Sequence, residues 1–417
     1  MTESSDDIPI VDLSSDPASV ASVIRDACVR HGFFYLTNHG VPRSLIDGMH
    51  DASRAFFALP ESAKRTVLAS NDANNRGWTP LGEETLDPAT QTRGDTKEGY
   101  YIGREIGPSS DEYGKPLRGP NQWPDEAKLG LTESGFREPM MRYHAALTNL
   151  CDSLMPSFAE ALGLHKDFFE DKFKFPTATL RPLRYSEHKS APEKGVLGAG
   201  AHSDYGVLTV LWTDGRNGLE IRKNDVWCPV KPLPDDTNAF ICNVGDLCER
   251  WTNGVFKSTV HRVVTTAGLA GLGNKRHSCA FFWEPDFDTF VEPLPACVAE
   301  NPPRAPGEGS ARDEDPVVAS SRSRGRRARA RGPDPPSPGL HRARPRVRRE
   351  SPRPSRRRRR ERAERGGCLA GARETRDEGD EGENEVSRAI CYVLAREDQP
   401  CPPPLAFARA TPRRGET

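Results

Sequence analysis

The side chains best suited to chemistry in this sequence are those of His202 and Asp204, which lie two positions apart in a run of β-forming residues, 199–211. Residues i and i+2 of a strand project from the same face, so the spacing predicts that the imidazole and the carboxylate point the same way. Such a pair can supply two of the three protein ligands of a 2-His-1-carboxylate site for Fe(II). A lone His-x-Asp is common by chance, so the hypothesis depends on a third ligand.

The candidate third ligand is His261, in the strand-like stretch 258–264. Strands distant in sequence can be neighbours in an antiparallel barrel, so His261 is predicted to approach His202 and Asp204 across the interior. The histidines would bind as neutral imidazoles and the aspartate as a carboxylate. Three protein ligands leave positions open for a chelating cosubstrate and O2, whereas a structural zinc site is closed by four ligands.

A carboxylate-binding pattern follows in the run 276–282, where Arg276 and Ser278 alternate onto one face. A guanidinium and a hydroxyl two residues apart can bind a carboxylate through charge-assisted hydrogen bonds. A dicarboxylic keto acid would chelate the iron at one end and meet Arg276 at the other, and Tyr185 would add a phenol hydrogen bond. The alternative is that Arg276 and Ser278 bind a carboxylate of the substrate itself.

The elements that must bring these residues together are short strands separated by turn signals. This pattern predicts a mostly β protein with flanking helices and a double-sheet barrel of jelly-roll type. Asn253-Gly254 favours a tight hairpin turn within it. The strand patterns cover residues 179–185, 199–211, 218–221, 225–230, 239–244, 258–265 and 278–284.

The region before the barrel mixes helices and strands. Helical spacing of apolar residues predicts helices over 19–31, 44–57 and 139–162. Between them, residues 70–120 are rich in Gly, Asn, Thr and Pro, with one strand pattern at 97–102. Such a stretch is either a surface loop or a segment that wraps the mouth of an active site. We therefore expect an N-terminal region over 1–125 that packs on a barrel domain over 126–300.

Charge divides the chain at about residue 300. The first 300 residues carry 31 basic and 42 acidic side chains, whereas residues 301–417 carry 28 Arg, no Lys and 18 acidic side chains. Residues 301–417 also contain only two aromatic residues, so we expect a disordered tail, or an artefact of out-of-frame translation. Arg-rich segments can bind nucleic acid, but this one lacks interleaved aromatic residues, which disfavours that hypothesis.

The cysteines and the N-terminus indicate a cellular setting. The ten Cys form no C-x-x-C pair, and residues 1–10 contain no apolar stretch typical of a secretory signal. No apolar run approaches the length that spans a bilayer. We therefore expect a cytoplasmic protein with free cysteines and no membrane partner.

Taken together, these motifs resemble the isopenicillin N synthase-like family of Fe(II)/2-oxoglutarate-dependent oxygenases. The resemblance extends over about residues 8–295. It rests on the His-x-Asp, His and Arg-x-Ser motifs together with the stretches 8–13, 32–41, 243–246, 251–254 and 281–285.

The resemblance implies a double-stranded β-helix that oxidises a small organic molecule with Fe(II), 2-oxoglutarate and O2. Hydroxylation, desaturation or ring closure would accompany release of succinate and CO2. His202, Asp204 and His261 would hold the iron, and Arg276 and Ser278 the distal carboxylate, with Tyr185 as a helper. An oxidase that needs no 2-oxoglutarate is the runner-up, and a barrel that only binds ligand is a third possibility that the intact ligand set disfavours.

Two features depart from the family pattern. Family members continue after the barrel into a C-terminal helical segment that helps to cover the active site, whereas here Arg/Pro/Gly-rich sequence begins soon after residue 300. A Gly-rich loop over 266–275 also precedes Arg276 and is expected only to lengthen a turn. If the tail is genuine, the cover over the active site is missing.

Overall fold

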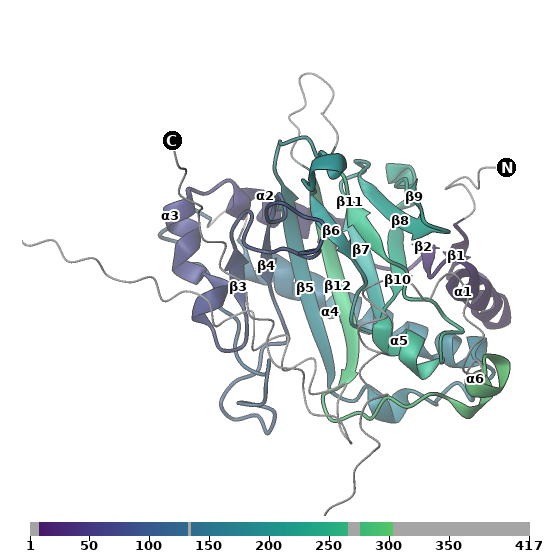
Figure 1. Ribbon diagram of the computed structural model, residues 1–417. Helices are drawn as coiled ribbons and strands as arrows, with labels where there is room; N and C mark the ends of the chain where they lie inside the picture. Colours follow the sequence, from purple (N-terminus) through teal and green to yellow (C-terminus); the bar gives the residue numbers. More distant parts are fainter. Residues whose placement is uncertain (1–7, 132–134, 266–275, 303–417) are drawn as a thin grey trace, which may run out of the picture. The chain divides into compact units, whose positions relative to one another are not determined.

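Two facing β-sheets form the centre of the protein (Figure 1). The computed structural model describes residues 8–131, 135–265 and 276–302. An eight-stranded sheet has the order β1-β2-β10-β7-β12-β5-β4-β3, and a four-stranded sheet has the order β6-β11-β8-β9. Residues from both sheets line one cavity between them. This arrangement, with helices outside the larger sheet, confirms the predicted jelly-roll core.

The strands have the following bounds. The larger sheet contains β1 (Ile10–Asp12), β2 (Phe33–Thr37), β3 (Gly77–Thr79), β4 (Lys97–Tyr101), β5 (Pro176–Tyr185), β7 (Leu208–Thr213), β10 (Phe240–Val244) and β12 (His277–Asp286). The smaller sheet contains β6 (Ala199–His202), β8 (Leu219–Lys223), β9 (Val226–Pro229) and β11 (His261–Val263). The predicted hairpin of β8 and β9 is confirmed, because the two strands pair antiparallel.

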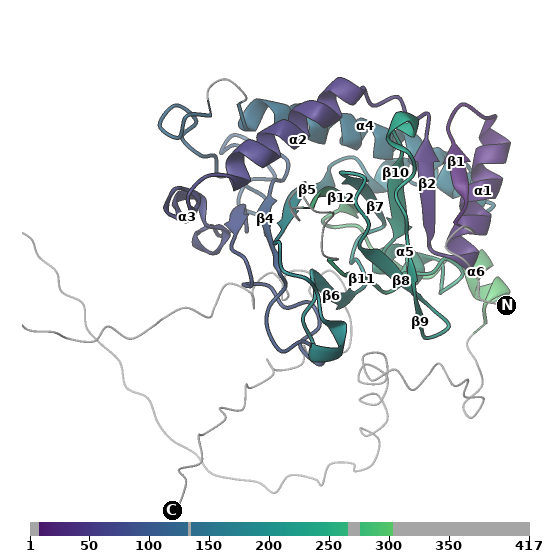
Figure 2. The same ribbon diagram turned by 90° about the horizontal axis from the view of Figure 1, so that it is seen from above.

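The helices α1, α2 and α4 pack on the larger sheet (Figure 2). α4 contacts β5, β12 and the helices α1 and α2. His144 of α4 packs against the sheet. Its Nε2 lies 3.1 Å from the Ala178 carbonyl, and its ring contacts the Phe281 ring edge-on. The helices are α1 (Pro17–Arg30), α2 (Arg43–Phe57), α3 (Glu61–Lys64), α4 (Arg137–Ala161), α5 (Asp246–Trp251) and α6 (Pro295–Glu300).

Alternation along β12 separates the hydrophobic core from the cavity. Phe281 and Trp283 belong to the buried cluster shared with the helices. Ser278 and Phe282, on the other face, line the cavity. Because side chains of a strand alternate between faces, one strand supplies both the core and a polar wall.

The prediction of a hairpin turn at Asn253-Gly254 is wrong, because these residues form the end of a helix. Asn253 and Gly254 do adopt positive φ values, 50° and 78°, but they follow α5 and end that helix. The Gly254 amide donates to the Glu249 carbonyl at 2.9 Å. Left-handed backbone favours Asn and Gly both in hairpin turns and at helix C-termini, so the dipeptide alone does not distinguish the two.

Two expectations concern residues outside the described ranges. The tail predicted over 301–417, with its nucleic-acid hypothesis, lies outside the described residues from 303 onward. The loop 266–275 also lies outside them. Within the described ranges, no helix is both long and apolar enough to cross a membrane.

Candidate metal and cosubstrate site

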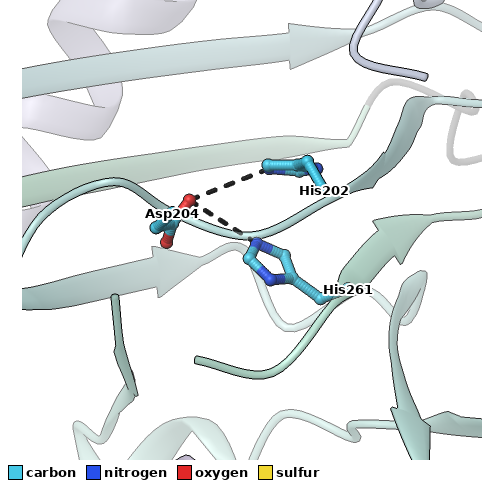
Figure 3. Close-up of side chains that lie close together, drawn as sticks. All are labelled: His202, Asp204 and His261. Carbon is cyan, nitrogen blue, oxygen red and sulfur yellow. Dashed lines mark ion pairs between the residues drawn. The ribbon is translucent and has the colours of Figure 1, made fainter. Parts of the chain in front are cut away.

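Three predicted side chains converge between the sheets (Figure 3). β11 pairs antiparallel with β6, which sets His261 directly opposite His202. Oδ1 of Asp204 lies 3.8 Å from Nε2 of His202 and 3.7 Å from Nε2 of His261. The three potential ligand atoms all lie within 4.8 Å of one another. The register of two neighbouring strands therefore brings together residues that are far apart in sequence.

Asp204 reaches this position from a turn, and not from the strand that its spacing predicted. β6 ends at His202, and the Asp204 carbonyl accepts the Asp246 amide at 2.8 Å. Oδ2 of Asp204 accepts hydrogen bonds from Thr209 Oγ1 at 2.6 Å and Asn243 Nδ2 at 2.8 Å. These two bonds hold the carboxylate so that Oδ1 faces the imidazoles.

Thr209 and Asn243 were missed as site residues by the sequence analysis. They pair in register on β7 and β10, so both side chains share the inner face of the sheet. The strand patterns of 199–211 and 239–244 contained them, but the pairing of those strands was not readable from either stretch alone.

Each histidine has a fixed tautomer. Nδ1 of His202 lies 2.8 Å from the Gly200 carbonyl, and Nδ1 of His261 lies 3.1 Å from the Thr259 carbonyl. Because a carbonyl can only accept, each Nδ1 carries the proton and each Nε2 keeps its lone pair for a metal. Burial and the neighbouring His261 lower the pKa of His202, which keeps that imidazole neutral.

The carboxylate is ionised. Burial alone would raise the pKa of Asp204, but attraction to any positive charge on His261 or His202 and the hydrogen bonds from Asn243 and Thr209 lower it. Two neutral imidazoles and one carboxylate, each oriented by further hydrogen bonds, match the donor set that non-haem Fe(II) takes. The residues present therefore fit the metal.

Unsatisfied donors lie at the other end of the same cavity. Arg276 precedes β12 and Ser278 lies within it, and their exposed fractions are 4% and 2%. Nη1 of Arg276 and Oγ of Ser278 have no hydrogen-bond partner among the described residues. The Arg276 guanidinium stacks over the Tyr185 ring at 4.8 Å, a contact through the ring face that the predicted phenol bond did not include. This end offers N–H and O–H groups to an anion.

One cavity connects the two ends. Its volume is about 70 Å³, and its wall contains His202, Asp204, His261, Tyr185, Arg276 and Ser278. Leu86 also lines it, so part of the irregular stretch 70–120 does reach the cavity. Apolar side chains such as Leu211 and Phe282 form much of the remaining wall.

Two buried cations in the cavity wall were not anticipated from the sequence. Lys97 of β4 and Arg181 of β5 both line the cavity. Glu84 lies 3.0 Å from Nζ of Lys97 and pairs with Nη2 of Arg181, and Asp95 also pairs with Lys97. The alternation of charged residues at 95 and 97 was a signal, but the same pattern is typical of a solvated strand face.

Family comparisons cover both halves of this structure. Residues 8–126 match the family described as non-haem dioxygenase in morphine synthesis N-terminal, and residues 178–285 match the 2OG-Fe(II) oxygenase superfamily. The second match includes the three converging residues and both Arg276 and Ser278.

Curated relatives align over most of their length. The chain is 34% identical to the 2-oxoglutarate-Fe(II) type oxidoreductase hxnY of Emericella nidulans, over 72% of this chain and 85% of the relative. It is also 34% identical to the Kihadalactone A synthase LFS of Citrus sinensis, over 71% of this chain and 86% of the relative.

Solved structures agree with these relatives. A full-length Neurospora crassa enzyme in complex with alpha-KG superposes with a TM-score of 0.60 at 29% identity, over 70% of this chain and 89% of that one. A putative 2OG-Fe(II) oxygenase family protein from Caulobacter crescentus gives 0.60 at 30% identity, over 72% and 94%. The chain therefore belongs to the 2OG-Fe(II) oxygenase superfamily and is an Fe(II)- and 2-oxoglutarate-dependent dioxygenase.

Proposed function

We propose that His202, Asp204 and His261 bind the Fe(II), and that Arg276 and Ser278 bind the distal carboxylate of 2-oxoglutarate. The observation that carries this assignment is the pattern of satisfied and unsatisfied atoms. Nδ1 of both histidines and Oδ2 of Asp204 are hydrogen-bonded, so only the three facing atoms stay available to a metal. At the far end, Nη1 of Arg276 and Oγ of Ser278 are free to donate hydrogen bonds among the described residues.

The chain's own residues bind, orient and shield the reactants. Bound Fe(II) and 2-oxoglutarate supply O2 activation, in which the keto acid becomes succinate and CO2 and a substrate C–H bond is oxidised. Arg276 supplies a fixed positive charge that sets the direction of the cosubstrate in the cavity. The ring of Tyr185 packs against that guanidinium and limits its rotamers. Apolar wall residues such as Leu211 exclude water from the reacting centre.

The substrate that we propose is a small organic molecule, which the enzyme hydroxylates, desaturates or cyclises. The largely apolar wall of the cavity supports this class. So do related structures: the Neurospora crassa enzyme has been solved with alpha-KG and thymine, and JOX2 has been solved with 2OG, Fe and JA.

The test is an anaerobic mixture of the protein, Fe(II), 2-oxoglutarate and a metabolite library, to which O2 is then added. Mass spectrometry should find one compound altered by gain of an oxygen atom or loss of two hydrogens, with an equal amount of succinate. A product that forms equally well without 2-oxoglutarate would favour the oxidase alternative instead.

Two further proposals concern the domain organisation and the cellular location. We propose that the N-terminal region 1–125 and the barrel region 126–300 form the oxygenase, so a protein ending at residue 302 should keep the fold and the metal affinity of the full chain.

We also propose a cytoplasmic location. Supporting this, seven cysteines within the described ranges are free thiols, as a reducing compartment favours. Cell fractionation of a tagged full-length chain would test the location.

A further inference from the structure

We infer that Asp95 is a positioning residue for His202 and acts through Gly200. The inference rests on the proposed role of His202 as a metal ligand. It goes beyond that role because it assigns a function to the segment before β4, which contains no residue of the metal or cosubstrate site.

A chain of two hydrogen bonds joins the carboxylate to the imidazole. Oδ1 of Asp95 accepts the Gly200 amide at 2.9 Å, and the Gly200 carbonyl accepts Nδ1–H of His202 at 2.8 Å. Asp95 is completely buried. A carboxylate is a stronger acceptor than a neutral carbonyl, so this bond fixes the end of β6 more firmly than a backbone contact would. The aim of the Gly200 carbonyl, in turn, sets the ring orientation of His202.

Residues of the same segment also pack closely against β6. A Cβ atom added at Gly200 would lie 2.1 Å from Oε1 of Gln91 and 2.8 Å from the amide nitrogen of Asp87. Gln91 also donates to Oδ1 of Asp95 at 2.8 Å. Backbone bonds continue the contact upstream, from the Thr96 amide to the Leu197 carbonyl at 3.0 Å. Only glycine at position 200 permits this approach.

Two cations hold the buried acids in place. Lys97 pairs with Oδ2 of Asp95 and lies 3.0 Å from Glu84. Glu84 in turn pairs with Arg181 and accepts the Tyr101 hydroxyl at 2.8 Å. The group contains two positive and two negative side chains, so its charges balance without a ligand. Lys97 and Arg181 line the cavity, and the network therefore links the cavity wall to the strand that carries His202.

The opposite face of β4 offers a matched control. Glu98, with an exposed fraction of 2%, accepts from Nζ of Lys64 and from Nε1 of Trp78, both at 2.7 Å, and pairs with Arg184. This is a buried carboxylate on the same segment with as many partners as Asp95. None of these three contacts reaches β6. A Glu98→Gln substitution, the counterpart of Asp95→Asn, therefore removes a buried charge with as many partners without touching the link to His202.

The test compares full-length Asp95→Ala, Asp95→Asn and Glu98→Gln proteins. Mn(II) serves as the metal, because it is stable in air, and its affinity is measured by titration alongside the thermal midpoint. Asp95→Ala should weaken Mn(II) binding about tenfold, the lower end of the effect of losing a partner beyond the ligands. Asp95→Asn should weaken it about threefold, since its amide oxygen still accepts from Gly200. Glu98→Gln should lower only the thermal midpoint.

A spectroscopic measurement separates positioning from general destabilisation. The visible spectrum of the Co(II)-loaded protein reports ligand geometry, and it should change in Asp95→Ala but not in Glu98→Gln. Wild-type affinity and spectrum in Asp95→Ala, or equal losses of affinity in Asp95→Ala and Glu98→Gln, would overturn the inference. If Asp95→Ala does not fold, an unchanged affinity in Asp95→Asn has the same consequence. Failure of the wild-type chain to bind Mn(II) would refute the proposed metal site instead.

Discussion

The two ends of the cavity differ in what their side chains leave available. At the metal end, hydrogen bonds satisfy Nδ1 of His202, Nδ1 of His261 and Oδ2 of Asp204. The remaining atoms, both Nε2 and Oδ1 of Asp204, can therefore offer lone pairs to a metal ion. At the other end, Nη1 of Arg276 and Oγ of Ser278 are buried without partners among the described residues. One end is therefore prepared for a cation and the other for an anion.

This difference explains why the protein tolerates buried donors that are unsatisfied. A buried polar group without a partner costs about 1–3 kcal/mol. That cost is recovered when a ligand with a carboxylate binds, whereas the metal end is already ordered by its own hydrogen bonds. Substitutions at the two ends should therefore affect different binding constants.

The largest effect is expected from loss of a metal ligand. His261→Ala removes one of three donors and leaves Asp204 with a single imidazole neighbour, so Mn(II) affinity should fall by more than about 100-fold and succinate formation should cease. Titration and succinate measurement check this. His165→Ala, in which a side chain 77% exposed is removed, should match the wild type. Retention of wild-type Mn(II) affinity in His261→Ala would eliminate this residue as a ligand.

A smaller effect, confined to the cosubstrate, is expected at Arg276. Arg276→Met keeps an apolar stem but removes the charge, which should raise the KM for 2-oxoglutarate between about 10- and 100-fold, because hydrogen bonds to charged groups contribute about 1.5–3 kcal/mol. Mn(II) affinity measured without 2-oxoglutarate should stay at the wild-type value. If both constants change by the same factor, the two ends are not independent.

Ser278 should contribute less than Arg276 because its hydroxyl is neutral. Ser278→Ala should raise the KM for 2-oxoglutarate about fivefold, equivalent to about 1 kcal/mol. The thermal midpoint of the ligand-free protein should not fall, since the hydroxyl that is removed has no partner among the described residues. A clear drop in that midpoint would mean that Ser278 has a structural partner, and the contrast between the two ends would weaken.

Local spacing was enough to predict part of this site. The period-2 alternation of β12 correctly set Ser278 and Phe282 on one face, and the strand pattern around His261 led to its meeting with His202. The position of Asp204 was predicted for the wrong reason, because β6 ends before it and a turn aims the carboxylate. A His-x-Asp in a strand and one that runs into a turn look alike in sequence.

The supporting residues could not be predicted because they depend on strand pairing. Thr209 and Asn243 meet Asp204 only through the pairing of β7 with β10. Asp95 reaches Gly200 across more than one hundred positions, and an acidic residue beside a lysine is typical of a solvated surface. Such a pair becomes part of a site only when it is buried, and the local sequence does not show which residues are buried.

The smallest effect is expected at Tyr185, where two interpretations differ. A phenol bond to the cosubstrate was predicted from the sequence, whereas the structure packs the ring face against the Arg276 guanidinium at 4.8 Å. Tyr185→Phe keeps that ring and should change the KM for 2-oxoglutarate less than twofold. Tyr185→Leu removes the cation–π contact, about 0.5–1 kcal/mol, and should raise the KM roughly two- to fivefold. A tenfold rise in Tyr185→Phe would instead show that the hydroxyl contacts the carboxylate, and the anion end would then have three donor side chains.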